Sequence, residues 1–247
     1  MGKHLSRLFL ESKQYLAPLQ GVELDAGLEE DPSLLSAACA EPFLANLHFI
    51  LQKAHPEAGA PYWRIRSWGL SCWQPIYLAL ICVYHLKRIP NSLGRLHQTQ
   101  QQAYVAGYAL PDGEWLAGEH EALVQHTAEQ LKTLFDALQT AHLNQFGGRQ
   151  ALYQALLADQ IMTTMVTAVG ASASLFDIQN EYQLWARYLD LPTDILNRLK
   201  QDTGKIIFTR RTCCLHFRRD DGELCADCPR GHKAKQSKVK PNKEPHV

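Results

Sequence analysis

This sequence of 247 residues lacks the short motifs that mark several common enzyme classes. It contains no glycine-rich phosphate-binding loop, no dinucleotide-binding fingerprint and no Gly-x-Ser-x-Gly motif. Those motifs place backbone N–H groups or an activated serine at a fixed turn between a strand and a helix. Their absence excludes a recognisable NAD(P)H site and a serine hydrolase of the α/β type. The sequence also shows no internal repeat.

A basic surface on the folded part is also missing. The net charge is zero, but six of the 25 Lys and Arg residues lie in residues 230–247, beside a single Glu. Residues 1–229 therefore carry 19 basic against 24 acidic side chains and are mildly acidic. Because a nucleic-acid-binding domain shows a basic face with interleaved aromatic residues, we predict no nucleic-acid partner. The Lys-rich residues 231–247 are predicted to be a disordered tail.

Residues 1–16 lack both a continuous apolar core and a small-residue cleavage site, so a secretory signal is not predicted. We therefore expect a reducing, cytoplasmic location, where disulfides are rare. The most apolar run, residues 68–86, has no formal charge but includes Gly69, Ser71, Gln74, Pro75 and His85. A spanning helix needs about 20 predominantly apolar residues. We interpret the run as a buried core helix with Pro75 in its first turn, and predict no transmembrane segment.

Apolar residues recur with helical spacing along most of the chain. The pattern predicts helices near residues 5–19, 43–51, 123–138, 151–165, 182–189 and 192–199. Asp31-Pro32 pairs an N-cap acid with a proline suited to the first helical position, so another helix is predicted to begin there. Pro42 is expected to open the helix over 43–51, and Gly147-Gly148 to end the helix that precedes it.

Two segments contain β-forming residues instead. Residues 96–115 lose the helical period, contain Tyr104, Val105 and Tyr108, and end near Pro111-Asp112-Gly113, which predicts a short strand or hairpin. Residues 205–217 are also rich in β-formers and lead to Asp221-Gly222, a typical two-residue hairpin turn. The predicted fold class is mainly α (α+β): a multi-helix domain with a short central β element and a C-terminal cysteine-bearing β-hairpin. The expected domains are residues 1–204, 205–230 and 231–247.

Four of the seven cysteines lie within sixteen residues, as Cys213-Cys214, ten intervening residues, and Cys225-x-x-Cys228. Four thiolates are the ligand set of an iron–sulfur cluster or a structural zinc ion. A hairpin turn at Asp221-Gly222 would bring the two cysteine pairs together. The remaining cysteines, Cys39, Cys72 and Cys82, are isolated, and we expect Cys72 and Cys82 to be small buried hydrophobic residues.

The spacing discriminates among three uses of these thiols. Four-cysteine zinc sites commonly use two Cys-x-x-Cys turns, whereas this chain has one. Adjacent cysteines in extended backbone point to opposite faces, which suits two irons better than one tetrahedral ion. A two-iron cluster is therefore favoured and a zinc site is the alternative. A disulfide between Cys213 and Cys214 with a redox Cys-x-x-Cys is disfavoured, because no βαβ pattern surrounds the motif.

The run Arg210-Arg211-Thr212-Cys213-Cys214-Leu215, followed by Cys225-Ala226-Asp227-Cys228-Pro229, resembles the C-terminal signature of the FhuF-type ferric siderophore reductases. The resemblance implies a [2Fe-2S] cluster held by Cys213, Cys214, Cys225 and Cys228. It assigns siderophore binding to residues 1–204 and the cluster to residues 205–230. It also implies one-electron reduction of siderophore-bound Fe(III) in the cytoplasm.

The expected partners are a ferric siderophore of hydroxamate type and an electron donor, either a ferredoxin or an NAD(P)H-dependent flavoprotein. The alternative function is a helical siderophore-binding protein without redox chemistry, with zinc on the four cysteines. Arg210, Arg211 and His216 are candidates for tuning the cluster potential, or ordinary exposed strand residues.

The segment around Trp63, Trp68 and Trp73 offers rings and cations that suit an oxygen-rich chelate, with Arg64 and Arg66 as the cations. Core packing is the favoured interpretation of the three tryptophans, and Arg64 and Arg66 fit surface charges equally well, so no substrate ligand is assigned.

His120-Glu121 followed by His126 resembles a zinc-protease motif, but the second histidine comes six residues after the first instead of four. Six helical residues rotate by about 600°, which places the two rings on different faces, and we reject a metal site there.

Overall fold

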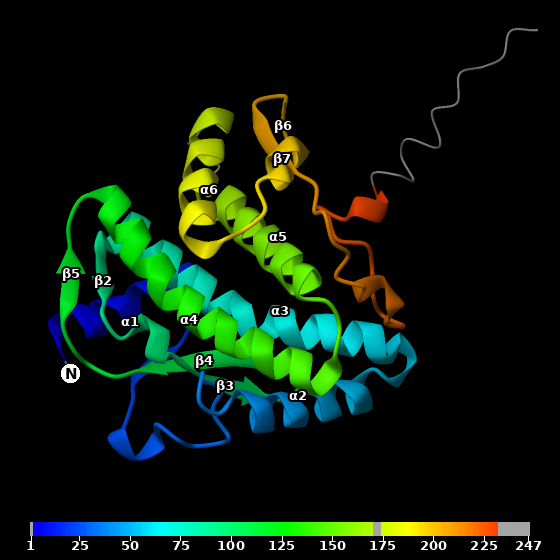
Figure 1. Ribbon diagram of the computed structural model, residues 1–247, viewed down its shortest axis with the longest axis horizontal. Helices are drawn as coiled ribbons and strands as arrows, with labels where there is room; N and C mark the ends of the chain where they lie inside the picture. The colour runs from blue at the N-terminus through cyan, green and yellow to red at the C-terminus, as the bar shows by residue number, and fades with distance from the viewer. Residues whose placement is uncertain (1, 170–173, 232–247) are drawn as a thin grey trace, which may run out of the picture.

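The computed structural model describes residues 2–169 and 174–231 of the chain. Within them the fold is mainly α with small sheets, which confirms the predicted fold class (Figure 1). The α-helices are α1 (Lys3–Tyr15), α2 (Ala40–Ala54), α3 (Gly59–Leu80), α4 (His120–Phe146), α5 (Gln150–Val169) and α6 (Leu175–Leu189). The strands are β1 (Gly21–Glu23), β2 (Arg88–Pro90), β3 (His97–Gln101), β4 (Tyr104–Leu110), β5 (Trp115–Ala117), β6 (Leu199–Asp202) and β7 (Lys205–Phe208). The shorter helical elements are η1 (Ala26–Leu28), η2 (Pro56–Ala58), η3 (Ile81–Leu86), η4 (Leu93–Arg95), η5 (Asp194–Arg198) and η6 (His216–Arg218).

Helix α3 is the centre of the fold. It packs against α2, α4, α5 and strand β4, and its second half is almost wholly buried. The stretch Pro56–Leu86 is long and apolar enough to cross a membrane by length and composition, yet 78% of its most apolar window lies buried inside the protein. This burial agrees with the predicted core helix.

Pro75 lies inside α3 and not in the first turn of a helix, so the expectation for this residue was wrong. Proline has no N–H, and the carbonyl of Ser71 loses its helical donor. The Gln98 side chain from β3 replaces that donor, with Nε2 donating to the Ser71 oxygen at 2.9 Å. Gln74 Nε2 in turn donates to Gln98 Oε1 and to the Gly107 carbonyl, both at 3.1 Å. Buried amides thus compensate for the proline and join α3 to the sheet.

The predicted β element over residues 96–115 is confirmed. Strand β4 lies between β1, to which it is parallel, and β3, to which it is antiparallel with an irregularity between Gln98 and Gln100. Residues 111–113 form an irregular connection from β4 to β5, which pairs with β2.

The prediction of a helix that begins at Asp31-Pro32 was wrong. The Asp31 carboxylate accepts the Ser33 N–H at 2.8 Å, and Leu35 instead forms a bridge with Gln98.

The other helices agree with their periodicity. α1, α2, α4 and α5 confirm the predicted elements, with Pro42 in the first turn of α2 and α4 ending at Gly147, whose φ is 63°. α6 begins before the expected position because Ser174 and Asp177 form a capping box. Residues 192–199 were expected to be an α-helix but form the 3-10 turn η5 and the start of β6.

The predicted cysteine-bearing hairpin was wrong in position. The C-terminal hairpin is β6–β7, which turns at Thr203 and Gly204 with φ of 47° and 78°, before the cysteines. From residue 209 to 231 the described chain contains no strand. Near Asp221-Gly222 the backbone folds on itself, since the Gly222 N–H donates to the Arg219 carbonyl at 3.0 Å. The expected boundary after residue 204 falls in the β6–β7 turn, and the predicted tail beyond Gly231 lies outside the described residues.

Candidate metal centre

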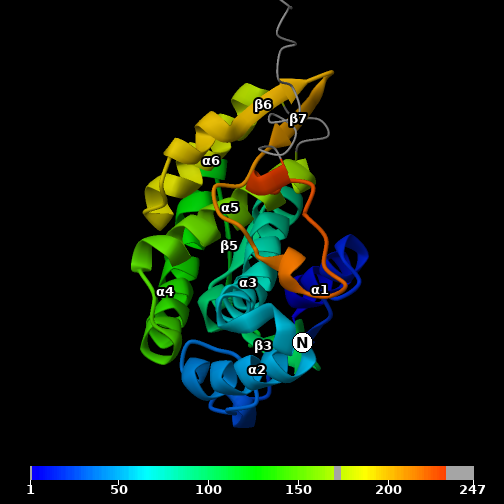
Figure 2. The ribbon, with the colours of Figure 1, turned by 90° about the vertical axis from the view of Figure 1, so that its right-hand side faces the viewer.

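The segment after β7 runs along one side of α5 and α3 (Figures 1 and 2). It brings the two halves of the cysteine motif together, because the Sγ atoms of Cys214 and Cys225 lie 2.9 Å apart. Cys228 is 3% exposed, whereas Cys213, Cys214 and Cys225 are half-buried. Cys39, Cys72 and Cys82 are buried in the body of the protein, as expected for Cys72 and Cys82, and burial raises the pKa of Cys72.

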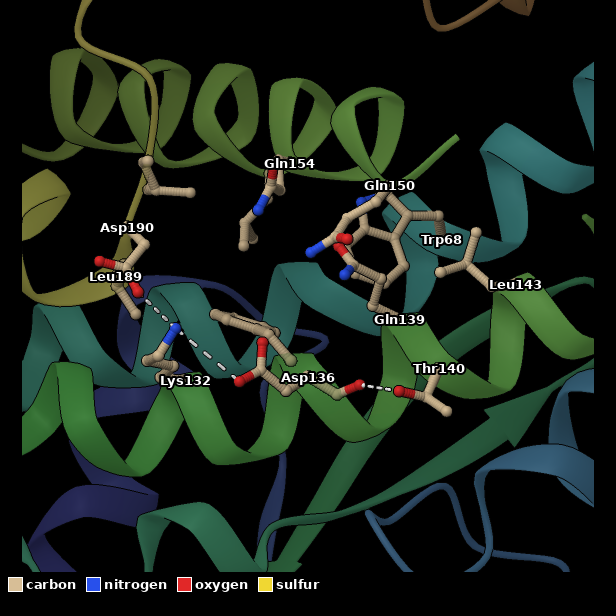
Figure 3. A pocket seen from close by; sticks show the side chains of 13 residues that line it. Trp68, Lys132, Asp136, Gln139, Thr140, Leu143, Gln150, Gln154, Leu189 and Asp190 are labelled. Carbon is tan, nitrogen blue, oxygen red and sulfur yellow. Dashed lines mark hydrogen bonds and ion pairs between the residues drawn. The ribbon is translucent and has the colours of Figure 1, made fainter. Parts of the chain in front are cut away.

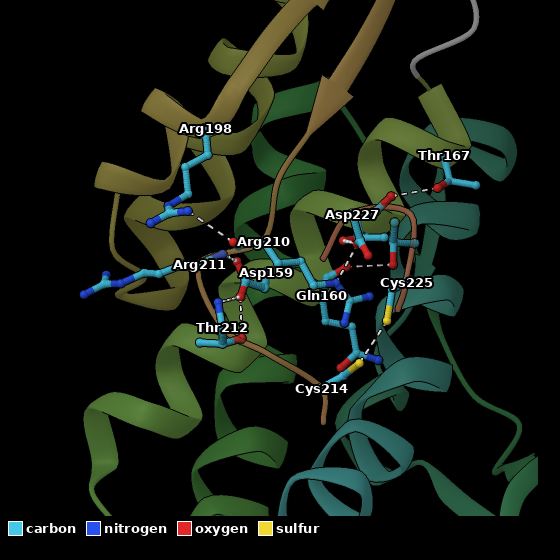
Figure 4. A network of polar contacts seen from close by, with 12 residues as sticks. Asp159, Gln160, Thr167, Arg198, Arg210, Arg211, Thr212, Cys214, Cys225 and Asp227 are labelled. Atoms are coloured by element: carbon cyan, nitrogen blue, oxygen red, sulfur yellow. Dashed lines mark hydrogen bonds and ion pairs between the residues drawn. The ribbon is translucent and has the colours of Figure 1, made fainter. Parts of the chain in front are cut away.

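A buried carboxylate fixes the chain immediately before the first cysteine. Asp159 on α5 is 1% exposed and accepts the backbone N–H groups of Arg211 and Thr212 at 2.8 and 2.6 Å (Figure 4). The Thr212 hydroxyl donates to the same carboxylate. Burial raises the pKa of Asp159, and these three hydrogen bonds oppose that rise. Asp159 therefore holds the backbone that leads directly to Cys213.

A second carboxylate lies inside the Cys-x-x-Cys turn. Asp227 Oδ2 accepts Arg210 Nε at 2.5 Å and the Thr163 hydroxyl of α5 at 3.0 Å. The Arg210 N–H also donates to the Asp227 carbonyl at 2.9 Å. Arg210 precedes the first cysteine pair and Asp227 separates the second, so this contact joins the two halves of the motif and attaches both to α5.

The surroundings of Cys214 favour its thiolate, which is the form that binds metals. Its hydrogen bond with Cys225 lowers the pKa of Cys214 to about 6, and the nearby Arg210 acts in the same direction. The same hydrogen bond raises the pKa of Cys225. The pair thus shares one proton, which metal binding would displace.

The donor set fits the two-iron group that the sequence resemblance implies. Four cysteine thiols lie within residues 213–228, and the structure brings one thiol from each half of the motif together, with 2.9 Å between the Sγ atoms of Cys214 and Cys225. Four thiolates are the ligand set of a [2Fe-2S] cluster.

Residues 210–230 match the family model described as the FhuF 2Fe-2S C-terminal domain. The chain carries a FhuF-type 2Fe-2S domain. These residues include all four cysteines of the motif, which confirms the resemblance and gives this segment a [2Fe-2S] cluster as its cofactor. No solved structure matches the chain.

The three candidate tuning residues differ in position. Arg210 is half-buried and ion-paired with Asp227 beside the cysteines. Arg211 points away from Cys214 and Cys225 and pairs with the exposed Asp194 at 2.9 Å (Figure 4). His216 is the first residue of η6. Burial lowers the pKa of His216, and the positive charge of Arg219 lowers it further. Arg210 is therefore the cation held next to the thiolates.

A cleft of about 330 Å³ opens beside Cys214, and we call it the aromatic cleft. Its walls come from α3, α5, β4, the segment after α1 and the FhuF-type domain. They comprise Leu16, Pro18, Ile65, Arg66, Trp68, Gly69, Leu70, Trp73, Tyr77, Tyr104, Leu156, Gln160, Thr163, Thr164, Arg210 and Cys214. Among the four motif cysteines, Cys214 is the one that lines this cleft.

The residues singled out around Trp63 divide between different places. Trp68 and Trp73 are buried, as expected for core residues, and with Arg66 they also line the aromatic cleft. Trp63 instead donates from Nε1 to the His55 carbonyl at 2.7 Å. Arg64 lines a separate cavity with His48 of α2 and with Gln145 and Phe146 of α4.

A further cleft of about 410 Å³ lies between α4 and α5, on another side of Trp68 (Figure 3). Its polar wall contains Lys132, which contacts Asp190 at 2.6 Å and Asp136 at 3.8 Å. The residues that line this cleft all lie outside the FhuF-type domain, so the four motif cysteines do not contribute to it.

The rejected His120 and His126 pair is separated in the structure as well. His120 Nε2 contacts Glu181 at 2.9 Å, whereas His126 Nε2 contacts Asn91 at 3.0 Å. The two rings therefore serve different contacts on α4.

The two carboxylates that hold the site were not predicted from the sequence. Asp227 had a local signal, since it lies between Cys225 and Cys228. Asp159 had a weaker one, because it is a lone acid in the apolar helix α5, where an unpaired charge would be unfavourable. Neither signal identified the backbone groups that they bind.

Proposed function

We propose that this protein is a ferric siderophore reductase, which transfers one electron to siderophore-bound Fe(III) and releases Fe(II) in the cytoplasm. The observation that supports the proposal most directly is that Cys214 belongs to two sites at once. It belongs to the cysteine set of the FhuF-type 2Fe-2S domain and to the wall of the aromatic cleft. A chelate in that cleft would lie next to a ligand of the redox group.

The proposed reaction needs no bond to be made or broken by a side chain. When bound, the cluster supplies a one-electron couple. A reduced ferredoxin or an NAD(P)H-dependent flavoprotein provides the electron, and Fe(III) of the substrate becomes Fe(II). Hard oxygen donors such as hydroxamates bind Fe(II) much more weakly than Fe(III), so the iron can then leave and the siderophore can be reused.

The residues of this chain fix the geometry of that transfer. Asp159 holds the approach to Cys213, and the pair of Arg210 and Asp227 ties the two halves of the motif to α5. Arg210 also brings a positive charge next to Cys214, which favours its thiolate form. The aromatic walls lie beside the half-buried Cys214, so a chelate bound in the cleft would be close to its sulfur.

A single-turnover experiment tests the proposal. Protein purified without oxygen should contain about two irons and two sulfides per chain and be coloured. After dithionite reduction and removal of excess reductant, a ferric trihydroxamate is added with a chromogenic Fe(II) chelator. We expect close to one Fe(II) per reduced protein, with return of the oxidised absorption spectrum.

Cysteine variants provide the matched controls. Cys214→Ser should lose the visible absorption, whereas Cys39→Ser, in the body of the protein, should keep it. Colourless protein with one zinc per chain would instead support the non-redox binding function. Coloured protein that never passes an electron to any hydroxamate, catecholate or carboxylate ferric complex would contradict the reductase.

A further inference from the structure

We infer that the aromatic cleft is the chelate-binding site and that Arg66 is the side chain that contacts the oxygen donors of the bound ferric complex. This inference rests on the proposed function and assigns the substrate-contacting residues within it. Three observations support this inference: the shape and walls of the cleft, the positive charge of Arg66, which is unpaired among the described residues, and the negative charge that the chelate gains on reduction.

The walls suit a compact organic chelate. Trp73, Tyr77 and Tyr104 give the cleft flat, amphipathic surfaces, and its volume of about 330 Å³ falls at the lower end of the range for small-molecule sites. Trp68 contributes part of its buried ring to the same walls.

The charge of the cleft is unbalanced. Its lining contains two guanidinium groups, Arg66 and Arg210, no carboxylate, and the ionisable Cys214 thiol, whose charge interacts with Arg210. Arg210 is neutralised by Asp227, at 2.5 Å. Arg66 is half-buried, lies over the Tyr104 ring with 5.7 Å from its guanidinium carbon to the ring centre, and has no acidic partner among the described residues. A partly buried cation without an anion favours a ligand that brings negative oxygen atoms.

Reduction makes that arrangement more favourable. When Fe(III) in a chelate becomes Fe(II), the complex gains one negative charge at the same place. Arg66 attracts that added charge more strongly in a half-buried cleft than it would in water, because the effective dielectric constant is lower. Arg66 should therefore stabilise the reduced complex more than the oxidised one and speed electron transfer in addition to binding.

Binding is measured apart from reduction by replacing Fe(III) with Ga(III), which has the same charge and is not reduced by dithionite. The Ga(III) complex of a cyclic trihydroxamate is titrated into oxidised holoprotein, and isothermal titration calorimetry gives its Kd. We expect Arg66→Gln to raise Kd about tenfold, the loss that corresponds to one charge-assisted hydrogen bond. Arg66→Lys should retain most of the affinity, and Tyr104→Leu should weaken binding by less than Arg66→Gln.

Arg64→Gln is the matched control, because Arg64 lies two residues away on the same helix and lines a different cavity. Its Kd and single-turnover rate should equal those of the wild type. The visible spectrum and circular dichroism of each variant establish that the fold and the cluster are intact. Arg66→Lys, which keeps the charge and most of the side chain, provides the decisive comparison if Tyr104→Leu is unstable.

The outcomes separate the site from the function. If Arg66→Gln binds Ga(III) complex and reduces Fe(III) complex as the wild type does, or if Arg64→Gln is weakened equally, the site assignment is overturned. If the wild type binds the Ga(III) complex in an Arg66-dependent way but never reduces the Fe(III) complex, the site stands and the reductase function fails. A fall in the single-turnover rate at saturating chelate in Arg66→Gln, recovered in Arg66→Lys, supports the charge argument.

Discussion

Replacing Asp159 with alanine should release the FhuF-type domain from α5 without unfolding the helical body. The change removes three hydrogen bonds and leaves the backbone N–H groups of Arg211 and Thr212 without an acceptor. Each lost partner of a buried or part-buried group costs about 1–2 kcal/mol, which gives about 2–4 kcal/mol for the attachment. Part of this loss is offset because the variant no longer buries the carboxylate.

Hydrogen exchange followed by mass spectrometry measures this attachment directly. A loss of about 3 kcal/mol corresponds to roughly a hundredfold faster exchange of the amides in the peptide that contains Arg211 and Thr212. Peptides from α2 and α4 should exchange at the wild-type rate. The variant should also lose iron and sulfide faster when an iron chelator is added.

Asp194→Ala provides the control, because Asp194 binds the side chain of Arg211 and not its backbone. That ion pair is exposed on both sides and should contribute little. Wild-type exchange at Arg211 and Thr212 in Asp159→Ala would refute the role assigned to the carboxylate. Equal acceleration in Asp194→Ala would show that any change near Arg211 loosens the segment.

Two further predictions concern the stability of the helical body. Gln98→Leu leaves the Ser71 carbonyl without its replacement donor and should lower the free energy of unfolding in urea by about 2–4 kcal/mol, whereas the exposed Gln101→Leu should change it by less than about 0.5 kcal/mol. His142 is fully buried, and burial lowers its pKa to about 4 from 6.5. As pH decreases, His142 binds a proton near pH 6.5 in the unfolded chain but only near pH 4 in the folded protein. The free energy of unfolding should therefore fall between about pH 6.5 and pH 4, by up to about 3 kcal/mol. His142→Gln should show a smaller fall over that window, and an identical fall in both proteins would contradict the assignment.

The parts of the fold that were predictable are those that local spacing determines. Apolar periodicity located α1, α2, α4 and α5, and cysteine spacing predicted four candidate ligands, of which the structure brings Cys214 and Cys225 together. Pro75 was misplaced because its cost is offset by Gln98, a residue from another element. Sequence spacing contains no information on such a contact.

The misplaced hairpin has a similar cause. Both Thr203-Gly204 and Asp221-Gly222 resemble tight turns. The segments on either side of Thr203-Gly204, Leu199–Asp202 and Lys205–Phe208, form paired strands. Around Gly222 the backbone forms local hydrogen bonds, and Arg219 pairs with Asp221 at 2.5 Å. Asp159 was missed as an anchor because its partners lie more than fifty residues further along the chain.

The two anchors on α5, Asp159 and Thr163, are one helical turn apart and face the same way. A peptide containing residues 205–231 alone would lose both of them. Such a fragment should not assemble a stable redox centre. A transplant of the four-cysteine motif into another scaffold would have to include this face of α5.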